Sequence, residues 1–278
     1  MSLYKNLFLA LLLSFTFSCQ SVLTKVAPQS VGMSPEKLKK VDKKVQDLIA
    51  KKRLAGASVM IARQGKVCFF ETYGMMDIES NKAMQEDTIF RIYSMSKAIT
   101  SAAVMQLVEQ GEIDLHAPVK NYIPEFSNLQ VYHNGKPKSV KNDLTTAHLL
   151  THTSGTLYGA GGKYGKLLKK ANALSKTNDL KTMAKGIASV PLAFEPGTDW
   201  AYGTSIDILG YLVEVVSKQD FSDYLSEHIL KPLEMSDTGF YVPAEKVERF
   251  AANYNSNGKG KLTLKDDPAK SRYLNRAY

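Results

Sequence analysis

Residues 90–97 read FRIYSMSK, a short apolar approach that ends in Ser94-Met95-Ser96-Lys97. Side chains three positions apart lie on one face of a helix, one turn apart. The first N–H groups of a helix have no intrahelical acceptor, so they favour an oxyanion that develops there. A lysine desolvated by apolar neighbours can take a proton from a serine hydroxyl, because burial disfavours its charged form. The stretch therefore predicts a nucleophilic Ser94 with Lys97 as its base.

The four-residue pattern Ser-x-x-Lys is not specific by itself, because it begins at Ser2, Ser34, Ser94 and Ser256. The first copy lies in an apolar N-terminal segment, the second opens a lysine-rich helix, and the fourth lies in a turn rich in Asn and Gly. Only the copy at Ser94 is followed by an apolar helical pattern that could bury its lysine. On local features alone, Ser94 could equally be a plain N-cap beside a Lys97 that extends into solvent.

The segments around this stretch predict an α+β fold. The residues after Ser34 show helical spacing, and the runs 57–63 and 67–73 flank a Gly-containing turn, which is typical of a β-hairpin. Residues 74–88 are polar and loop-like. Further helices are predicted over residues 94–110, 146–150, 178–189, 205–217 and 221–230.

Two finer expectations concern the helix after Ser94 and the segment that follows it. Ala98, Ala102, Met105 and Val108 recur at helical spacing and predict the buried stripe. Residues 118–165 are rich in Gly, Pro, Asn and Thr, which indicates long surface loops.

Composition is ordinary for a globular protein, with 44% hydrophobic and 23% charged residues in a chain of 278. The formal charge is +9, from 36 Lys and Arg against 27 Asp and Glu. The lysines are spread along the chain, and no aromatic ladder or nucleic-acid motif accompanies them. The charge therefore indicates a solvated basic surface, and we expect no nucleic-acid partner.

The N-terminus resembles an export signal. Lys5 precedes the apolar run 7–17, which is too short to span a bilayer and ends at Ser18-Cys19. We expect a signal peptide over residues 1–18, a linker over 19–33 and one domain over 34–278. The chain would then be secreted or periplasmic. Two alternatives stay open: lipidation of Cys19, which would attach the protein to a membrane, and a buried N-terminal helix.

Ordered blocks downstream of Ser94 carry a family resemblance. They are LVEQGEIDL at 107–115, LLTHTSG at 149–155, EPG at 195–197 before Trp200, and ILKPLEM at 229–235. Together with FRIYSMSK they resemble the β-lactamase-related serine hydrolases, which include class C β-lactamases, esterases of the same fold and D-aminopeptidases. The resemblance covers about residues 30 to 275. It implies a β-lactamase/transpeptidase-like fold, with an antiparallel sheet flanked by a helical region.

The same resemblance implies an activity. Family members cleave a short-chain ester, a β-lactam or a D-amino-acid peptide through an acyl-enzyme, which would form here on Ser94, and no cofactor is implied. The family's Tyr-x-Asn-like motif falls on Tyr202-Gly203-Thr204. Tyr202 would then move the proton with Lys97, and Thr204 would bind substrate in place of the usual Asn. His148 and His152 lack the Glu of a His-Glu-x-x-His zinc motif, so we expect no metal.

A third family motif, a Lys/His/Trp-x-Gly triplet on a late strand, has no match before Tyr278. That strand carries the second oxyanion N–H in the family. The resemblance therefore predicts a chain whose C-terminal strands are missing. The alternative to an enzyme is a catalytically inactive, truncated remnant or an envelope-associated binding protein.

Overall fold

The computed structural model describes residues 24–133, 136–159 and 162–275. The signal peptide expected over residues 1–18 and the lipidation expected at Cys19 lie outside the described residues. Among the residues that are described, no helix is both long and apolar enough to cross a bilayer.

The chain divides into two compact units, each described here by itself. One unit, here called the sheet unit, runs to Thr88 and includes Ala252–Lys265. The other, here called the helical unit, spans Ile89–Ala251 and resumes at Asp266.

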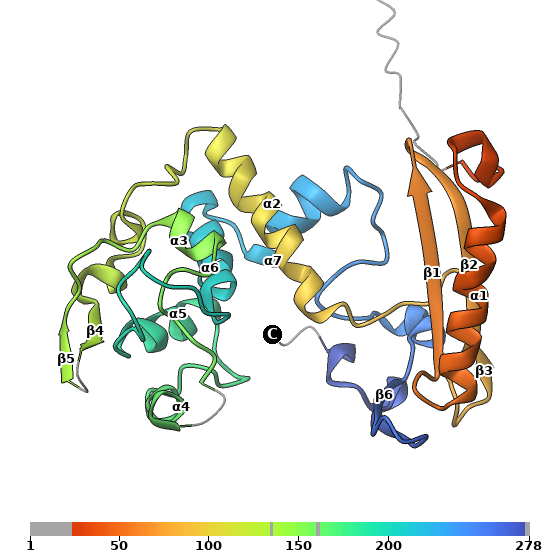
Figure 1. The fold of residues 1–278 in the computed structure, drawn as a ribbon. Coiled ribbons are helices and arrows are strands. Elements are labelled where there is room, and N and C mark those ends of the chain that lie inside the picture. Colours follow the sequence, from red (N-terminus) through yellow and green to blue (C-terminus); the bar gives the residue numbers. More distant parts are fainter. Residues whose placement is uncertain (1–23, 134–135, 160–161, 276–278) are drawn as a thin grey trace, which may run out of the picture. The chain divides into compact units, whose positions relative to one another are not determined.

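The sheet unit begins with helix α1 (Pro35–Ala50), which lies along a β-hairpin (Figure 1). The helix starts where the sequence predicts, because the Ser34 hydroxyl accepts a hydrogen bond from the Lys37 N–H at 3.3 Å. Its buried face carries Leu38 and Val45. The Ser-x-x-Lys copy at Ser34 is therefore a helix N-cap.

The predicted hairpin is confirmed as antiparallel strands β1 (Gly56–Arg63) and β2 (Lys66–Asp77). The expectation of a loop from residue 74 is wrong in part, because β2 continues to Asp77 and pairs with β3 (Lys82–Ala83). Gly74 misled the prediction. It lies opposite Gly56 in the register, and a Cβ on Gly74 would stand 2.5 Å from the Ala55 carbonyl oxygen. Gly74 is thus a strand glycine that allows close backbone approach.

Strands β6 (Asn253–Ser256) and β7 (Leu262–Asp266) form a second antiparallel pair. The fourth Ser-x-x-Lys copy therefore starts at the end of a strand. Cys68, on β2, is buried with a free thiol that donates to the Ile61 carbonyl at 3.4 Å. It is the small buried residue that its apolar strand pattern predicts.

The helical unit is built around α6 (Ser205–Ser217), which is buried along most of its length. Helices α2 (Ser96–Glu109), α3 (Thr146–Leu150), α5 (Leu180–Ala188) and α7 (Phe221–Leu225) all pack against α6 (Figure 1). The predicted helices near these positions are confirmed. The last one continues beyond α7 as a π-helical turn, Ser226–Leu230.

The predicted stripe of α2 is wrong. The buried positions are Thr100, Ala103, Val104 and Leu107, whereas the Met105 side chain is 44% exposed. Small and apolar residues occupy most of the helix, so their spacing does not single out one face. Contacts with α6 and α7 decide which face is buried.

The segment 118–165 is more ordered than a set of surface loops. It contains the hairpin β4 (Gln130–His133) and β5 (Lys136–Ser139), and helix α4 (Gly162–Lys170) was not expected at all. Isolated apolar residues anchor the segment in the core, including Val119 and Ile123, both fully buried. Turn-forming residues dominate its composition and hide these anchors from a pattern-based prediction.

The strands of the sheet unit and the helices of the helical unit confirm the predicted α+β class. Each fold element of the site described below belongs to the helical unit.

Candidate active site

Ser94 lies in a short 3₁₀ turn, Tyr93–Met95, immediately before α2. The N-cap position of α2 is Met95, and no side chain caps this helix. The Ser94 hydroxyl oxygen instead lies 2.7 Å from the Tyr202 hydroxyl and 3.4 Å from the Lys97 ammonium nitrogen. Ser94 is therefore not the N-cap that one interpretation of the sequence allowed. The three side chains that the sequence singles out meet at one point.

The backbone just before Ser94 is strained. Tyr93 has a φ of +43°, in the left-handed region that a bulky side chain rarely adopts. Such conformations persist only where the surrounding structure enforces them, and they gather at functional sites. The strained turn presents Ser94 at the surface, where its side chain is exposed.

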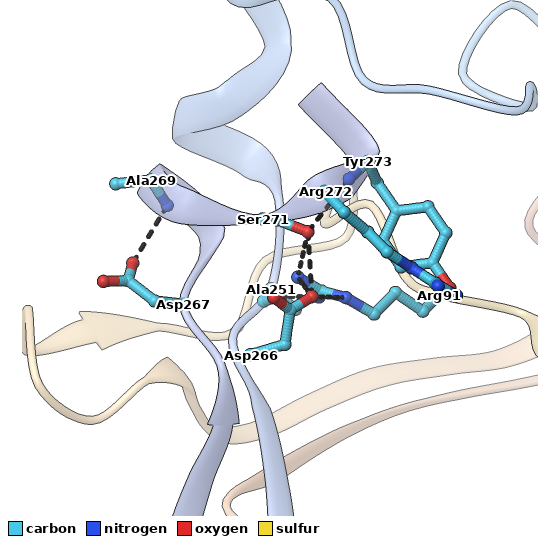
Figure 2. A network of polar contacts seen from close by, with 8 residues as sticks. All are labelled: Arg91, Ala251, Asp266, Asp267, Ala269, Ser271, Arg272 and Tyr273. Carbon is cyan, nitrogen blue, oxygen red and sulfur yellow. Dashed lines mark hydrogen bonds and ion pairs between the residues drawn. The ribbon is translucent and has the colours of Figure 1, made fainter. Parts of the chain in front are cut away.

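Arg91, two residues before this turn, lies in a network of polar contacts (Figure 2). Its side chain is 5% exposed and its Nε donates to Asp266 Oδ2 at 2.6 Å. It also donates to the Ala251 carbonyl, and its guanidinium lies 3.8 Å from the centre of the Phe250 ring. The Ser271 hydroxyl bonds the same Asp266 oxygen at 2.8 Å. A buried ionic clamp thus holds the chain three residues before Ser94.

Lys97 is less buried than the sequence predicts. Its side chain is only partly covered, and its nitrogen lies 4.7 Å from the centre of the Tyr202 ring. The hydrogen bond with Lys97 lowers the pKa of the Tyr202 hydroxyl, and the one with Ser94 adds to the effect. The positive charge therefore favours the phenolate form of Tyr202, next to the Ser94 hydroxyl.

Aromatic rings surround Tyr202. The His152 ring stacks on it, with centroids 4.9 Å apart, and the Tyr158 ring lies 5.7 Å away at a tilt. The Trp200 ring meets His152 edge-on at 6.4 Å. Burial, and after it the charge of Lys97, lowers the pKa of His152, which favours its neutral form.

An acidic group lies behind these rings. The Tyr158 hydroxyl donates to Asp207 Oδ2 at 2.9 Å. Burial raises the pKa of Asp207, although this hydrogen bond and the charge of Lys97 oppose the rise. The charge of Lys97 thus acts on the Asp207 carboxylate, which lies on α6, as well as on Tyr202.

The backbone around Tyr202 is fixed by close approach. A Cβ on Gly203 would stand 1.9 Å from the Thr156 carbonyl oxygen, so no larger residue fits without a shift. The Ala201 N–H donates to the His152 carbonyl at 3.0 Å, and the Gly203 N–H donates to His152 Nδ1 at 3.3 Å. The chain on both sides of Tyr202 is therefore bound to His152.

A buried cluster of hydroxyl groups supports the same segment. Ser154 Oγ lies 2.8 Å from both Thr156 Oγ1 and Ser205 Oγ, and all three side chains are fully buried. Satisfied buried hydroxyl groups of this kind hold two segments in one arrangement.

Thr204 does not take the place that the sequence predicts. Its side chain is fully buried, and its hydroxyl has no hydrogen-bond partner among the described residues. A substrate cannot reach it in this structure, so the expectation of a substrate-binding Thr204 is corrected. Since Thr204 leads directly into α6, its backbone follows the helix and its side chain turns into the core.

His148 is likewise a packing residue, because its ring lies against Gly197. A Cβ on Gly197 would stand 2.8 Å from His148 Nε2. Within the described ranges, no group of three or more His, Cys, Asp or Glu side chains is arranged to hold a metal ion.

Comparison with known proteins shows the family and the fold. The β-lactamase family model matches residues 41–273. The chain belongs to the β-lactamase family. Esterase EstB of Burkholderia gladioli is 35% identical over 82% of this chain and 57% of EstB. Protein flp of Staphylococcus aureus is 27% identical over 82% of this chain and 43% of flp. The chain thus spans about half the length of these curated relatives.

Solved structures of related proteins show the same fold. EstCE1, described as a hydrolase with promiscuous acyltransferase activity, superposes with a TM-score of 0.74 at 27% identity, covering 83% of this chain and 59% of EstCE1. Simvastatin synthase LovD of Aspergillus terreus gives a TM-score of 0.70 at 25% identity, covering 84% and 61%. The family therefore includes hydrolases and acyltransferases.

Sequence reasoning named Ser94, Lys97 and Tyr202, and the structure brings them together. It missed the positions around them. His152 and Trp200 lie in or next to the family blocks, and this position in the sequence could have identified them as site residues. Arg91 lies in the FRIYSMSK block, but its partner Asp266 is 175 residues away. Tyr158 and Asp207 carry no local pattern, because they are 49 residues apart in the chain.

Proposed function

We propose that this chain is a serine hydrolase of the Ser-x-x-Lys type that forms an acyl-enzyme from a small-molecule ester. The observation that carries the proposal is the contact of Ser94 Oγ with the Tyr202 hydroxyl at 2.7 Å, beside the Lys97 nitrogen at 3.4 Å. A nucleophile within hydrogen-bond reach of a proton acceptor, which a third group orients, is the arrangement that acyl transfer requires. The resemblance to an esterase supports the same reaction class.

In the proposed acylation step, the Tyr202 phenolate takes the proton of the Ser94 hydroxyl. Ser94 Oγ forms a bond to the ester carbonyl carbon, and the tetrahedral oxyanion is held in part by the Ser94 N–H. The bond to the alcohol oxygen then breaks, and Tyr202 returns the proton to that oxygen. Water, or a second alcohol in an acyl transfer, attacks the acyl-enzyme by the reverse route. Lys97, which lies against the Tyr202 ring and lowers the pKa of its hydroxyl, favours the phenolate whenever Tyr202 has given up its proton.

An ester fits this site better than a β-lactam or a D-amino-acid peptide. The latter two carry amides, which the family's Asn holds, and the side chain that replaces it here, Thr204, is buried. The proposed chemistry uses no cofactor and no metal.

Export to the periplasm or the exterior, with or without lipidation of Cys19, belongs to the same proposal and rests on the N-terminal sequence alone. Feeding an alkyne fatty acid to cells that express the chain, and comparing it with Cys19→Ala, tests the lipid. Label in the parent and none in the variant is expected for a lipoprotein. Absence of label in both would leave plain secretion.

The test of the reaction is covalent labelling. Incubation with a small fluorophosphonate, followed by peptide mass spectrometry, should place the adduct on Ser94. The Ser94→Ala variant should not be labelled, and Ser256→Ala, which removes another Ser-x-x-Lys copy, should be labelled like the parent. An adduct on Ser154 or Ser256, or none on a folded chain, would refute the proposal and favour a binding protein. Parallel assays with a nitrophenyl ester and nitrocefin compare ester with β-lactam.

A further inference from the structure

Large apolar side chains are exposed around the proposed site. Tyr93 is 51% exposed and Met95 64%, one on each side of Ser94 in the chain. Trp200 is 62% exposed and Tyr202 44%. Exposed apolar side chains that cluster at one site mark a binding surface, whereas single ones need no explanation. The side chains here flank both groups that the proposed reaction uses.

Trp200 is the only tryptophan of the chain, and its backbone is held in place. The Gly197 N–H donates to the Thr153 carbonyl at 2.8 Å and the Ala201 N–H donates to the His152 carbonyl at 3.0 Å. The Trp200 N–H itself donates to Asp199 Oδ1 at 2.7 Å. The Trp200 side chain is exposed, but its backbone is already fixed by these hydrogen bonds. A ligand that binds there therefore loses little free energy in ordering the segment.

The rings of Trp200, His152 and Tyr202 form a continuous row. Trp200 meets the edge of His152, and His152 stacks on Tyr202, whose hydroxyl contacts Ser94. A group bound against the Trp200 end of this row is thus linked through two ring contacts to the reacting hydroxyls. Among the aromatic rings of the described residues, the His152 ring contacts Trp200, and Trp200 is 62% exposed.

We infer that Trp200, with the edge of His152, is a platform that binds an uncharged, phenyl-sized apolar group of the ester substrate. The inference rests on the proposed function and names the substrate class of the same site. Burial of the indole against an aromatic group removes apolar surface from water and adds ring–ring contact. The Asp199 carboxylate, bound to the backbone N–H of Trp200, disfavours an anionic group, and Lys97 against the Tyr202 ring disfavours a cationic one.

The platform can be tested without turnover, because Trp200 supplies all of the tryptophan fluorescence of the chain. In the Ser94→Ala variant, excited at the red edge of tryptophan absorption, we titrate two isomers, benzyl acetate and methyl phenylacetate, with ethyl acetate as control. A shift of the emission to the blue and weaker quenching by acrylamide are expected with at least one benzyl ester, and not with ethyl acetate. The isomer that acts shows whether the alcohol or the acyl side occupies the platform. No response to either isomer would overturn the inference.

A second measurement uses selectivity in the Ser94-containing chain. The ratio of Ser94 acylation rates for the favoured benzyl ester and for ethyl acetate should fall about three- to tenfold in Trp200→Ala, the size of one ring–ring contact. Trp200→Phe should keep most of the ratio, and Leu233→Ala, which removes an equally exposed side chain elsewhere, should keep all of it. An unchanged ratio in Trp200→Ala would contradict the platform.

The two proposals fail in different ways. If the small fluorophosphonate does not label Ser94 in the parent chain, the proposed reaction is wrong, while the fluorescence titration still tests the platform. If Trp200→Ala is labelled by the fluorophosphonate as fast as the parent but its ester ratio is unchanged, the reaction stands and the platform is wrong.

Discussion

The two sides of the proposed site are held by different forces. On the Ser94 side, a nearly buried Arg91 binds Asp266, and this charged pair anchors the turn (Figure 2). On the Tyr202 side, the contacts beneath the ring are neutral: the close approach of Gly203 to Thr156 and a cluster of buried hydroxyl groups. The contact between the Ser94 and Tyr202 hydroxyls joins the two sides directly, and Lys97 contacts both residues.

The difference predicts how each side fails. A buried ion pair fails when one partner is removed, because the remaining charge is left without compensation. A neutral, close-packed contact is disrupted when a larger side chain is introduced, because the neighbouring backbone atoms cannot move aside without strain. The four substitutions below test this contrast, beginning with the largest expected effect.

Tyr202→Phe breaks the contact that joins the two sides. We expect the rate of Ser94 labelling to fall by about 10²–10⁴-fold, the range for loss of a general acid–base group. The free energy of unfolding should change little, because phenylalanine keeps the ring contacts and the residue is 44% exposed. Labelling kinetics by intact mass spectrometry measure the first effect and urea denaturation the second. A near-normal labelling rate in this variant would show that another group takes the proton.

Asp266→Ala breaks the Ser94 side. The charge of Arg91, 5% exposed, would lose its partner, and we expect the free energy of unfolding to fall by about 3–5 kcal/mol. The neighbouring Asp267 is the matched control, because its side chain caps a 3₁₀ turn, accepting from the Ala269 N–H at 2.9 Å, and its ion pair with Lys270 is long, at 3.9 Å, and exposed. Asp267→Ala should cost about 1 kcal/mol. Urea denaturation measures both. An equal loss of unfolding free energy in the two variants would show that the Arg91–Asp266 pair contributes no more than an exposed cap.

Gly203→Ala breaks the Tyr202 side. The added methyl group would collide with the Thr156 carbonyl oxygen, at a cost of about 1–3 kcal/mol in the free energy of unfolding. Since the shift would move Tyr202, labelling of the folded fraction should slow as well. Gly239→Ala is the control, because the nearest atom to its added Cβ, the Tyr241 carbonyl oxygen, is 3.7 Å away. The contrast would disappear if both variants melted and reacted like the parent.

Lys97→Met changes the electrostatics between the two sides. Lys97 lowers the pKa of Tyr202, so the phenolate forms at a lower pH than in an ordinary tyrosine. A rate that needs the phenolate rises with pH through this pKa, and loss of the cation raises the pKa. The pH profile of Ser94 labelling should therefore move to higher pH in Lys97→Met. Lys97→Arg, which keeps the charge, should stay closer to the parent. If the pH profile of Lys97→Met were the same as that of the parent, Tyr202 would not be the base whose titration controls the rate.

Local features of the sequence predicted most of the elements, because their signals lie within a few residues of one another. Ser34 before Pro35 marks the start of α1, and the helix beginning after Tyr202-Gly203-Thr204 follows an apolar period. The errors have a physical cause in each case. Gly74 reads as a loop residue but lies in a strand opposite another glycine. The apolar residues of α2 do not identify which face is buried, because the contact with α6 decides it.

The sequence by itself determined the family, the α+β class and the identity of Ser94, Lys97 and Tyr202 as candidates, since these depend on ordered motifs. Only the tertiary structure decided how they work together. It placed Tyr202 rather than a buried lysine next to the Ser94 hydroxyl, turned Thr204 into the core, and paired Arg91 with Asp266. These contacts join residues that are 108 and 175 positions apart, and no local propensity encodes a distance between such segments. Packing of α2 against α6 brings Ser94, just before α2, to Tyr202, just before α6, and thereby sets the chemistry that these side chains can perform.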